Sequence, residues 1–217
     1  MLEFLQSNIY ELLNKAGEHV WVSMGSLALG ILIAVPVAIL LINHKKIAQL
    51  VISICSVLQT IPSLALLAIM VPMFGVGKVP AIIALFIYSL LPILRNTYIG
   101  LNGVDENLLD AAKGMGMSQG QIIKQIQFPL AFPVIMSGIR LSAVYVIGWA
   151  TIASYVGAGG LGDFIFAGLN NFNFYLIISA TVLVTTLALV IDLVLNQVEK
   201  YFTPTTSSKK KEGVVSE

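Results

Sequence analysis

Five long apolar runs, separated by shorter polar segments, dominate the chain. They cover approximately residues 19–43, 47–74, 79–101, 129–156 and 174–197. A helix needs about 20 predominantly apolar residues to cross the hydrocarbon core of a bilayer, and each run reaches that length. The pattern therefore predicts an all-α integral membrane protein with about five transmembrane helices, in which residues 19–201 form the membrane domain.

The longest polar segment between these runs, residues 104–129, reads VDENLLDAAKGMGMSQGQIIKQIQFP and predicts two short helices joined by a turn. Gly116 permits a left-handed turn after the first helix because it has no Cβ. Ser118, followed three residues later by a glutamine, forms a capping box that begins the second helix. That helix should end near Phe128, because a residue that precedes a proline is disfavoured in the α conformation. Neither helix is long enough to span a bilayer, so this hairpin should lie outside the hydrocarbon.

The two ends of the chain are more polar than the runs between them. Residues 1–18 carry apolar side chains at helical spacing, including Ile9, Leu12 and Leu13, which predicts an amphipathic N-terminal helix. Such a helix can lie on the membrane surface or pack against the other spans, and the pattern fits both arrangements. Residues 202–217 contain clustered lysines and few apolar side chains, so they are expected to form a disordered cytoplasmic tail.

Lysine residues orient the predicted spans. If the 104–129 hairpin is cytoplasmic, the alternation of five spans places most lysines on the same side, as the positive-inside rule requires. The C-terminus is then cytoplasmic and the N-terminus lies outside. The expected cytoplasmic lysines are Lys45, Lys46, Lys113, Lys124, Lys200, Lys209, Lys210 and Lys211, against Lys15 and Lys78 on the outer side.

Composition supports a membrane protein and excludes several functional classes. Of the 217 residues, 57% are hydrophobic and only 11% are charged, whereas soluble domains are about 25% charged. A formal net charge of +1, without a basic aromatic patch, argues against a nucleic-acid partner. The sequence contains no G-x-x-x-x-G-K-[ST] motif, so any ATP that drives this protein would be bound by another chain.

No group of residues in the sequence predicts catalysis or metal binding. His19 and His44 lie at the ends of apolar runs, where an interfacial role is a simpler interpretation than metal ligation. Cys55 is the only cysteine, so it cannot form a disulfide within the chain. We therefore expect no catalytic residue, no metal site and no cofactor bound by this chain.

The second apolar run contains a polar segment with a proline. Gln59 and Thr60 precede Pro62, which removes a backbone donor and should bend the helix. At this depth, polar side chains and freed carbonyl groups face protein or a water-filled path rather than lipid. The segment could therefore line a translocation path, and simple packing between helices is the alternative.

Three charged residues fall inside the predicted spans. Arg95, Arg140 and Asp192 lie about 8–10 Å from the cytoplasmic ends of their helices, at 1.5 Å per residue. Because isolated charges are costly at this depth, Asp192 is expected to pair with Arg140 or Arg95. The alternative is that the long arginine side chains reach the interface separately.

A glycine-rich segment follows the fourth run and reads GAGGLG from Gly157 to Gly162. It matches the pattern G-x-G-x-x-G, but a dinucleotide site needs a preceding strand in a βαβ unit, and here a membrane helix precedes. The segment instead predicts backbone that approaches another chain closely or re-enters the membrane.

The 104–129 hairpin resembles the cytoplasmic loop of ABC-importer permeases. That loop has the pattern E-A-A, three residues, G, nine residues, then I-x-L-P. Aspartate replaces the glutamate here and phenylalanine replaces the leucine, and an ordinary surface hairpin is the alternative. The matching residues, at the same spacing, are Asp110, Ala111, Ala112, Gly116, Ile126 and Pro129.

Two further segments resemble permeases that import quaternary-ammonium osmoprotectants: QTIPSLALLAIMVPMFGVG, which begins at Gln59, and the GAGGLG run. The resemblance implies a bacterial cell-membrane importer of glycine betaine, choline, carnitine or related compounds. Its permease would pair with an identical or sister permease. Two ATPase subunits, which hold ATP and Mg²⁺, would dock on the hairpin, and a solute-binding protein would deliver cargo outside.

The resemblance also implies roles for residues in the spans and the outer segment. Aromatic faces attract a quaternary ammonium through cation–π interaction, so Tyr145 and Trp149 are added to the candidates for the path, and other aromatics such as Tyr88 are expected mainly to pack. A methionine or phosphonate importer is the nearest alternative, and an ATP-independent secondary transporter or channel is the alternative of another class. The candidates for contact with a docked binding protein, or for an outer gate, are Gly157, Gly159, Gly160, Gly162 and Asp163.

Overall fold

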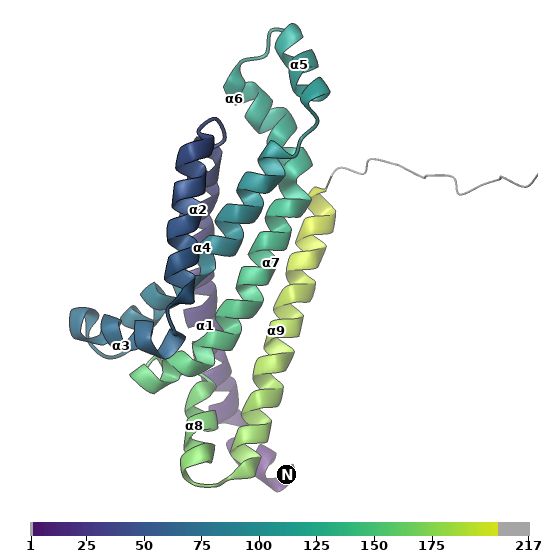
Figure 1. The fold of residues 1–217 in the computed structure, drawn as a ribbon. Coiled ribbons are helices and arrows are strands. Elements are labelled where there is room, and N and C mark those ends of the chain that lie inside the picture. Colours follow the sequence, from purple (N-terminus) through teal and green to yellow (C-terminus); the bar gives the residue numbers. More distant parts are fainter. Residues whose placement is uncertain (1, 204–217) are drawn as a thin grey trace, which may run out of the picture.

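The computed structural model describes residues 2–203, with side chains from Asn8 onward, and the described residues contain helices and no strand (Figure 1). This confirms the predicted all-α fold class. A π-helical turn, Ile123–Gln127, joins α6 to α7, and a 3₁₀ turn, Ser154–Val156, follows α7. The α-helices are α1 (Leu2–Leu40), α2 (Lys45–Thr60), α3 (Ser63–Phe74), α4 (Lys78–Asn102), α5 (Glu106–Gly114), α6 (Gln119–Ile122), α7 (Phe128–Ala153), α8 (Gly162–Asn170) and α9 (Phe174–Phe202).

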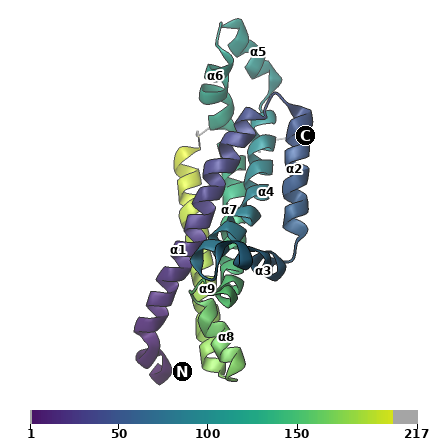
Figure 2. The ribbon, with the colours of Figure 1, turned by 90° about the vertical axis from the view of Figure 1, so that its left-hand side faces the viewer.

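The long helices α1, α4, α7 and α9 pack along one another, and the α5–α6 hairpin projects from one end of this bundle (Figures 1 and 2). The α1–α2 connection and the carboxyl end of α9 lie at this hairpin end. The amino end of α1 and the short helix α8 lie at the opposite end. Among the described residues, four helices are long and apolar enough to cross a membrane, and α2 with α3 makes a fifth span if the bent pair is counted as one.

Close contact between α4 and α7 forms the centre of the bundle. A Cβ added to Gly138 of α7 would lie 2.6 Å from the carbonyl oxygen of Pro92 in α4, so only glycine permits this approach. The Ser142 hydroxyl donates to the Ser89 carbonyl oxygen at 2.9 Å. Small residues and hydroxyl groups at such contacts are typical of helices that pack within a membrane. In contrast, α9 lies at the edge, with only 11% of its most apolar window buried.

No helix break accompanies the expected boundary at residue 18, because α1 continues from Leu2 to Leu40. Leu12 is fully buried and belongs to one cluster with Leu161, Phe164 and Ala180, so this part of α1 packs against other helices. Ion pairs from Lys15 and Lys78 partly neutralise Glu18, which lies at the expected boundary. The apolar side of residues 8–18 therefore packs against other helices of the bundle, which explains the amphipathic pattern.

The predicted span over residues 47–74 consists of two helices, with a bend at the proline where the sequence predicted one. The axis bends by 95° between α2 and α3, and α3, with 12 residues, is too short to cross a bilayer alone. The break falls at Ile61 and Pro62, where proline lacks the N–H that would continue the helix. The Tyr88 hydroxyl donates to the Ile61 carbonyl oxygen at 2.6 Å and so satisfies one carbonyl group at the break.

The second helix of the hairpin does not end near Phe128, as the sequence predicted. Helical backbone continues from Gln119 to Val156, a length of 38 residues. In the π-helical turn, the Phe128 N–H donates to the Ile123 carbonyl oxygen, five residues back. This wider turn accommodates Pro129, whose ring would clash with the carbonyl group four residues back in a regular α-helix. The hairpin is therefore continuous with α7.

The predicted C-terminal tail starts at residue 202, whereas α9 extends through Phe202. The remainder of that prediction, residues 204–217, lies outside the described residues.

Candidate functional site

The α5–α6 hairpin has well-defined ends. The Asp105 carboxylate accepts the Asn107 N–H at 2.9 Å and so caps α5. In the capping box of α6, the Ser118 N–H donates to the Gln121 side-chain oxygen at 2.7 Å, and the Gln121 N–H donates to the Ser118 hydroxyl at 3.4 Å. Gly116 has a φ of +81°, the left-handed conformation that the turn was predicted to need.

The hairpin exposes apolar side chains outside the bundle. Leu108 is 49% exposed and Met115 is 74% exposed, whereas only Ala112 of α5 is buried. Asp110 pairs with Lys113 at 2.8 Å across one turn of α5, and Ala111 and Gly116 are exposed as well. Large apolar side chains exposed beside charged ones are typical of a surface that binds another protein.

The far end of the matching pattern lies at the base of the hairpin. Ile126 and Pro129 are half-buried, on the π-helical turn and at the start of α7. The structure thus separates the predicted contact residues into those at the tip, where Asp110, Ala111 and Gly116 are exposed and Ala112 is buried, and a base that packs against the bundle.

An aromatic cluster lies beside the break between α2 and α3. The Gln59 side-chain amide donates to the Tyr88 carbonyl oxygen at 3.3 Å. The Tyr88 ring lies 4.4 Å from the Trp149 ring, centroid to centroid, and Trp149 lies 5.4 Å from Tyr145. Tyr145 is 41% exposed, so the cluster extends from the core to the surface of α7.

Thr60 and Pro62 are less involved in this cluster. Thr60 is exposed, and its hydroxyl donates to the Val57 carbonyl oxygen of its own helix at 2.7 Å. Pro62 lies at the break between α2 and α3 and affects the cluster only by ending α2 beside it. A mostly apolar groove of about 740 Å³ lies nearby, between α3 and the 3₁₀ turn after α7; it is lined by Leu64, Ala68, Val71, Val76, Ser154, Tyr155, Val156 and Gly157.

The glycine-rich segment approaches α1 of the same chain. A Cβ added to Gly159 would lie 2.6 Å from a Glu18 carboxylate oxygen, and one added to Gly160 would lie 3.0 Å from His19 Nδ1. The Gly160 N–H donates to Glu18 Oε2 at 3.2 Å. Gly157, Gly159 and Gly160 all have positive φ, from +75° to +86°.

Charged residues tie this segment to the rest of the opposite end. Lys15 contacts Asp163 at 2.7 Å and Glu18 at 3.2 Å, and Lys78 contacts Glu18 at 3.2 Å. Gly162 begins α8, and a side chain there would collide with the Thr151 carbonyl oxygen of α7. The glycine-rich segment, α1, α4 and α8 therefore hold one another in place through groups of this chain.

Of the two pairings expected for Asp192, the structure contains the one with Arg140. The guanidinium donates from Nε at 2.8 Å and from Nη2 at 3.0 Å to the two carboxylate oxygens, and from Nη1 to Glu199 at 3.2 Å. These bonds join α7 to α9 beside a pocket of about 420 Å³. Arg95 is exposed, and none of the salt bridges among the described residues includes it.

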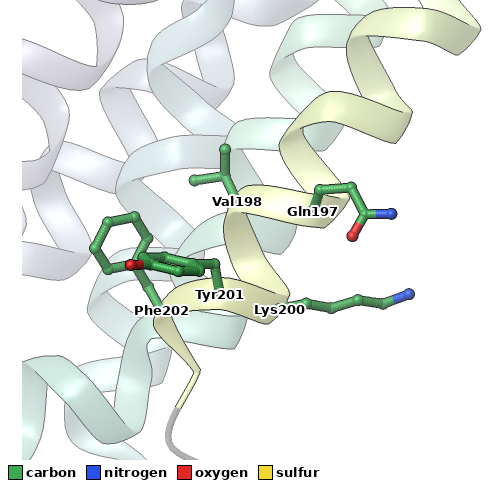
Figure 3. A pocket seen from close by; sticks show the side chains of 5 residues that line it. All are labelled: Gln197, Val198, Lys200, Tyr201 and Phe202. Atoms are coloured by element: carbon green, nitrogen blue, oxygen red, sulfur yellow. The ribbon is translucent and has the colours of Figure 1, made fainter.

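A third hollow lies at the carboxyl end of α9, with a volume of about 550 Å³ (Figure 3). The Tyr201 and Phe202 rings lie side by side, and Lys200 extends away from them. Phe202 also packs against Phe132 of α7, with ring centroids 5.7 Å apart. All residues that line this hollow come from one helix, and none was a predicted site residue: Gln197, Val198, Lys200, Tyr201 and Phe202.

The family model described as "Binding-protein-dependent transport system inner membrane component" matches residues 26–208. The chain belongs to this family. The permease is 53% identical over 213 residues to the carnitine transport permease protein OpuCB of Listeria monocytogenes, with 98% of each chain covered. It is 52% identical over 212 residues to the choline transport system permease protein OpuBB of Bacillus subtilis, again with 98% of each chain covered.

The permease also has the fold of a solved ABC transporter subunit. Its structure superposes on a chain of the inward-facing MetNI methionine ABC transporter with a TM-score of 0.82, covering 91% of this chain and 99% of that one. Only 22% of the aligned residues are identical, so this likeness concerns the fold alone.

Tyr88 packs in the core as the sequence predicted, whereas its central position in the aromatic cluster and the role of Gln127 were not predicted. Tyr88 is central to the aromatic cluster, although nothing in the sequence separates it from other aromatics in the spans. Gln127 is 5% exposed, and its amide donates to the Leu101 carbonyl oxygen at 3.1 Å. The only sign of Gln127 in the sequence is that a polar residue follows Ile126. A regular helix that ended at Phe128 would not direct this side chain into the protein.

Proposed function

We propose that this chain is the membrane-spanning subunit of an ATP-binding-cassette importer that moves osmoprotectants into the cell. Its cargo would be glycine betaine, choline, carnitine or a related quaternary amine. The observation that carries this proposal is the similarity, above 50% identity over 98% of each chain, to permeases named for carnitine and choline. No chemistry is required of the chain itself, because a permease changes the location of its cargo and leaves the covalent structure intact.

The hairpin is the proposed contact with the ATPase. Leu108 and Met115 provide apolar area, and Asp110 with Lys113 provides charge at the edge of that area. The Gly116 turn brings the two short helices together at a compact tip. ATP and Mg²⁺ would be held entirely by two ATPase subunits, and their closure would displace the hairpin.

Lysine placement supports a cytoplasmic hairpin and an outer N-terminus. The hairpin, the α1–α2 connection and the carboxyl end of α9 share one end of the molecule, and the lysines of these segments share it with them. Positive charge is retained on the cytoplasmic side of a bacterial inner membrane. The opposite end, with the glycine-rich segment, would then receive cargo from an external binding protein.

The translocation path would run between this permease and a second, identical or sister permease. Tyr145 is exposed on α7 and touches Trp149, so the pair presents aromatic surface beside the helix break. Aromatic faces attract a quaternary ammonium without a hydrogen bond, and such weak attraction is suited to passage rather than retention.

Transport by a reconstituted complex tests this proposal. The permease would be co-expressed with its ATPase and binding protein, placed in liposomes, and assayed for ATP hydrolysis and uptake of radiolabelled choline, carnitine and glycine betaine. We expect at least one of these to stimulate both activities, and methionine and phosphonates to stimulate neither. Stimulation by methionine or a phosphonate alone would assign the complex to that class of importer. Uptake without ATP would indicate a secondary transporter or channel.

A further inference from the structure

The π-helical turn at the base of the hairpin directs one polar side chain into the protein. Gln127 is 5% exposed, whereas Lys124 and Gln125 of the same turn are exposed. One extra residue in a helical turn rotates the residues that follow by about 100° relative to a regular α-helix. The wide turn that accommodates Pro129 therefore also determines which side of the helix faces α4.

Gln127 binds the carboxyl end of α4. Its Nε2 donates to the Leu101 carbonyl oxygen at 3.1 Å, and Leu101 itself is fully buried. Leu101 lies one residue before the end of α4, where carbonyl groups lack partners within the helix. The amide thus satisfies a buried carbonyl group that water cannot reach.

Only the donor half of this amide is used. Gln127 Oε1 is buried and has no hydrogen-bond partner among the described residues. A carbonyl oxygen can only accept, so the NH₂ group must face Leu101 and the orientation of the amide is unambiguous.

We propose that Gln127 is a positioning residue for transport: it ties the hairpin to α4, so that displacement of the hairpin moves α4 together with α7. The inference rests on the proposed role of the hairpin as the ATPase contact. Residues 103–105 join α4 to α5, and α4 packs against the π-helical turn and α7, so the Gln127 bond adds a directional polar contact to these links at the base of the hairpin. Since α4 packs against both α1 and α7, a displacement transmitted through this bond to α4 would reach the central helices of the bundle.

The first test compares Gln127→Met with Gln125→Met in the reconstituted complex with ATPase and binding protein. Methionine keeps the length of the side chain and removes the donor, and Gln125 is a neighbouring glutamine on the exposed side. For Gln127→Met, we expect ATP hydrolysis within about twofold of the unmodified complex and cargo moved per ATP lowered roughly tenfold, which corresponds to one unsatisfied buried carbonyl group. Gln125→Met should leave that ratio unchanged. An unchanged ratio in an assembled Gln127→Met complex would overturn the proposal.

The second test does not depend on a variant at Gln127. Spin labels on cysteines placed at the exposed positions Asn102 and Lys124, in a Cys55→Ser background, report the distance between the end of α4 and the π-helical turn. With Gln127 intact, the distance distribution should be the same in the nucleotide-free and ATP-bound complex. A shift approaching one helical turn, about 5.4 Å, would show that the two segments separate and would overturn the proposal.

These outcomes are distinguishable from failure of the proposed function. A hairpin that does not bind the ATPase would abolish co-purification and ATP-dependent uptake already in the unmodified complex. If the unmodified complex transports cargo and both tests fail, only the role of Gln127 is wrong.

Discussion

The two ends of this permease differ in how their charged side chains are paired. At the end opposite the hairpin, Glu18 accepts from Lys15, Lys78 and the Gly160 N–H, each at 3.2 Å, and Lys15 also binds Asp163. These contacts join three helices and the glycine-rich segment. At the hairpin end, the ion pair of α5 lies within a single turn, and Leu108 and Met115 are exposed. One end pairs its charged groups across several helices of the chain, whereas the ion pair at the other end stays within one short helix.

The largest expected effect comes from the hairpin, the proposed contact with the ATPase. Gly116→Asp should abolish uptake while the protein still inserts in the membrane. The backbone at Gly116 has a φ of +81°, where a side chain costs about 1–2 kcal/mol, and the added carboxylate would meet the docked ATPase. Gly120→Asp places the same side chain on α6, where φ is not positive and nothing lies within 4 Å. Radiolabelled uptake should fall to background only for the first variant, and normal uptake by Gly116→Asp would contradict the assigned contact.

A smaller effect is expected where α9 is joined to the bundle. Arg140→Met leaves Asp192 and Glu199 without their shared partner, and we expect a loss of about 2 kcal/mol in the free energy of unfolding. Arg95→Met is the matched control, because Arg95 is exposed and forms none of the salt bridges found. Thermal unfolding of the purified permease in detergent measures both. Equal shifts for the two variants would mean that the ion cluster does not hold α9.

Gly159→Ala tests the contacts at the end opposite the hairpin. The new Cβ would lie 2.6 Å from a Glu18 carboxylate oxygen, at a φ of +75°, so Glu18 must move and its bonds weaken. We expect a loss of about 1 kcal/mol in stability. Gly148→Ala, in the middle of α7 with open space around it, should be neutral or stabilising. If Gly159→Ala unfolds at the unmodified temperature, the contact with α1 is not a determinant of this end.

The smallest effect is expected between the two ends, at the aromatic cluster. Tyr145→Ala removes exposed aromatic surface, and transport should slow by about two- to fivefold without a change in which osmolyte is preferred. Exchanging the binding protein should change that preference, and Tyr10→Ala, at an 86% exposed position on α1, should leave the rate unchanged. A redirection of uptake from glycine betaine to choline by the permease substitution alone would contradict this division of roles.

Much of the fold was predictable because it depends on local patterns. Apolar length identified the spans, and the residues of the capping box and the left-handed turn form the hairpin as expected. That Asp192 pairs with an arginine followed from the cost of an isolated charge in a membrane, and the structure selects Arg140 over Arg95.

The predicted helix end near Phe128 failed because a proline can be accommodated in more than one way. Pro62 breaks its span with a bend of 95°, whereas Pro129 lies in a helix that continues through a π-helical turn. Which outcome occurs depends on partners distant in sequence, such as the Tyr88 hydroxyl at the Ile61 carbonyl oxygen. The target of the glycine-rich segment was hidden for the same reason, because Glu18 lies 142 residues from Gly160.

The uninterrupted helical backbone from Gln119 to Val156 connects the hairpin to the opposite end of the permease, so a tilt at one end would displace the other. Its 38 residues span roughly 57 Å, and Val156 lies on the wall of the apolar groove at the far end. A tilt of about 5° at the hairpin would therefore swing the groove wall by about 5 Å, close to the width of a quaternary ammonium group. Small angular changes on one side of the membrane would thus be amplified into an opening or closing on the other.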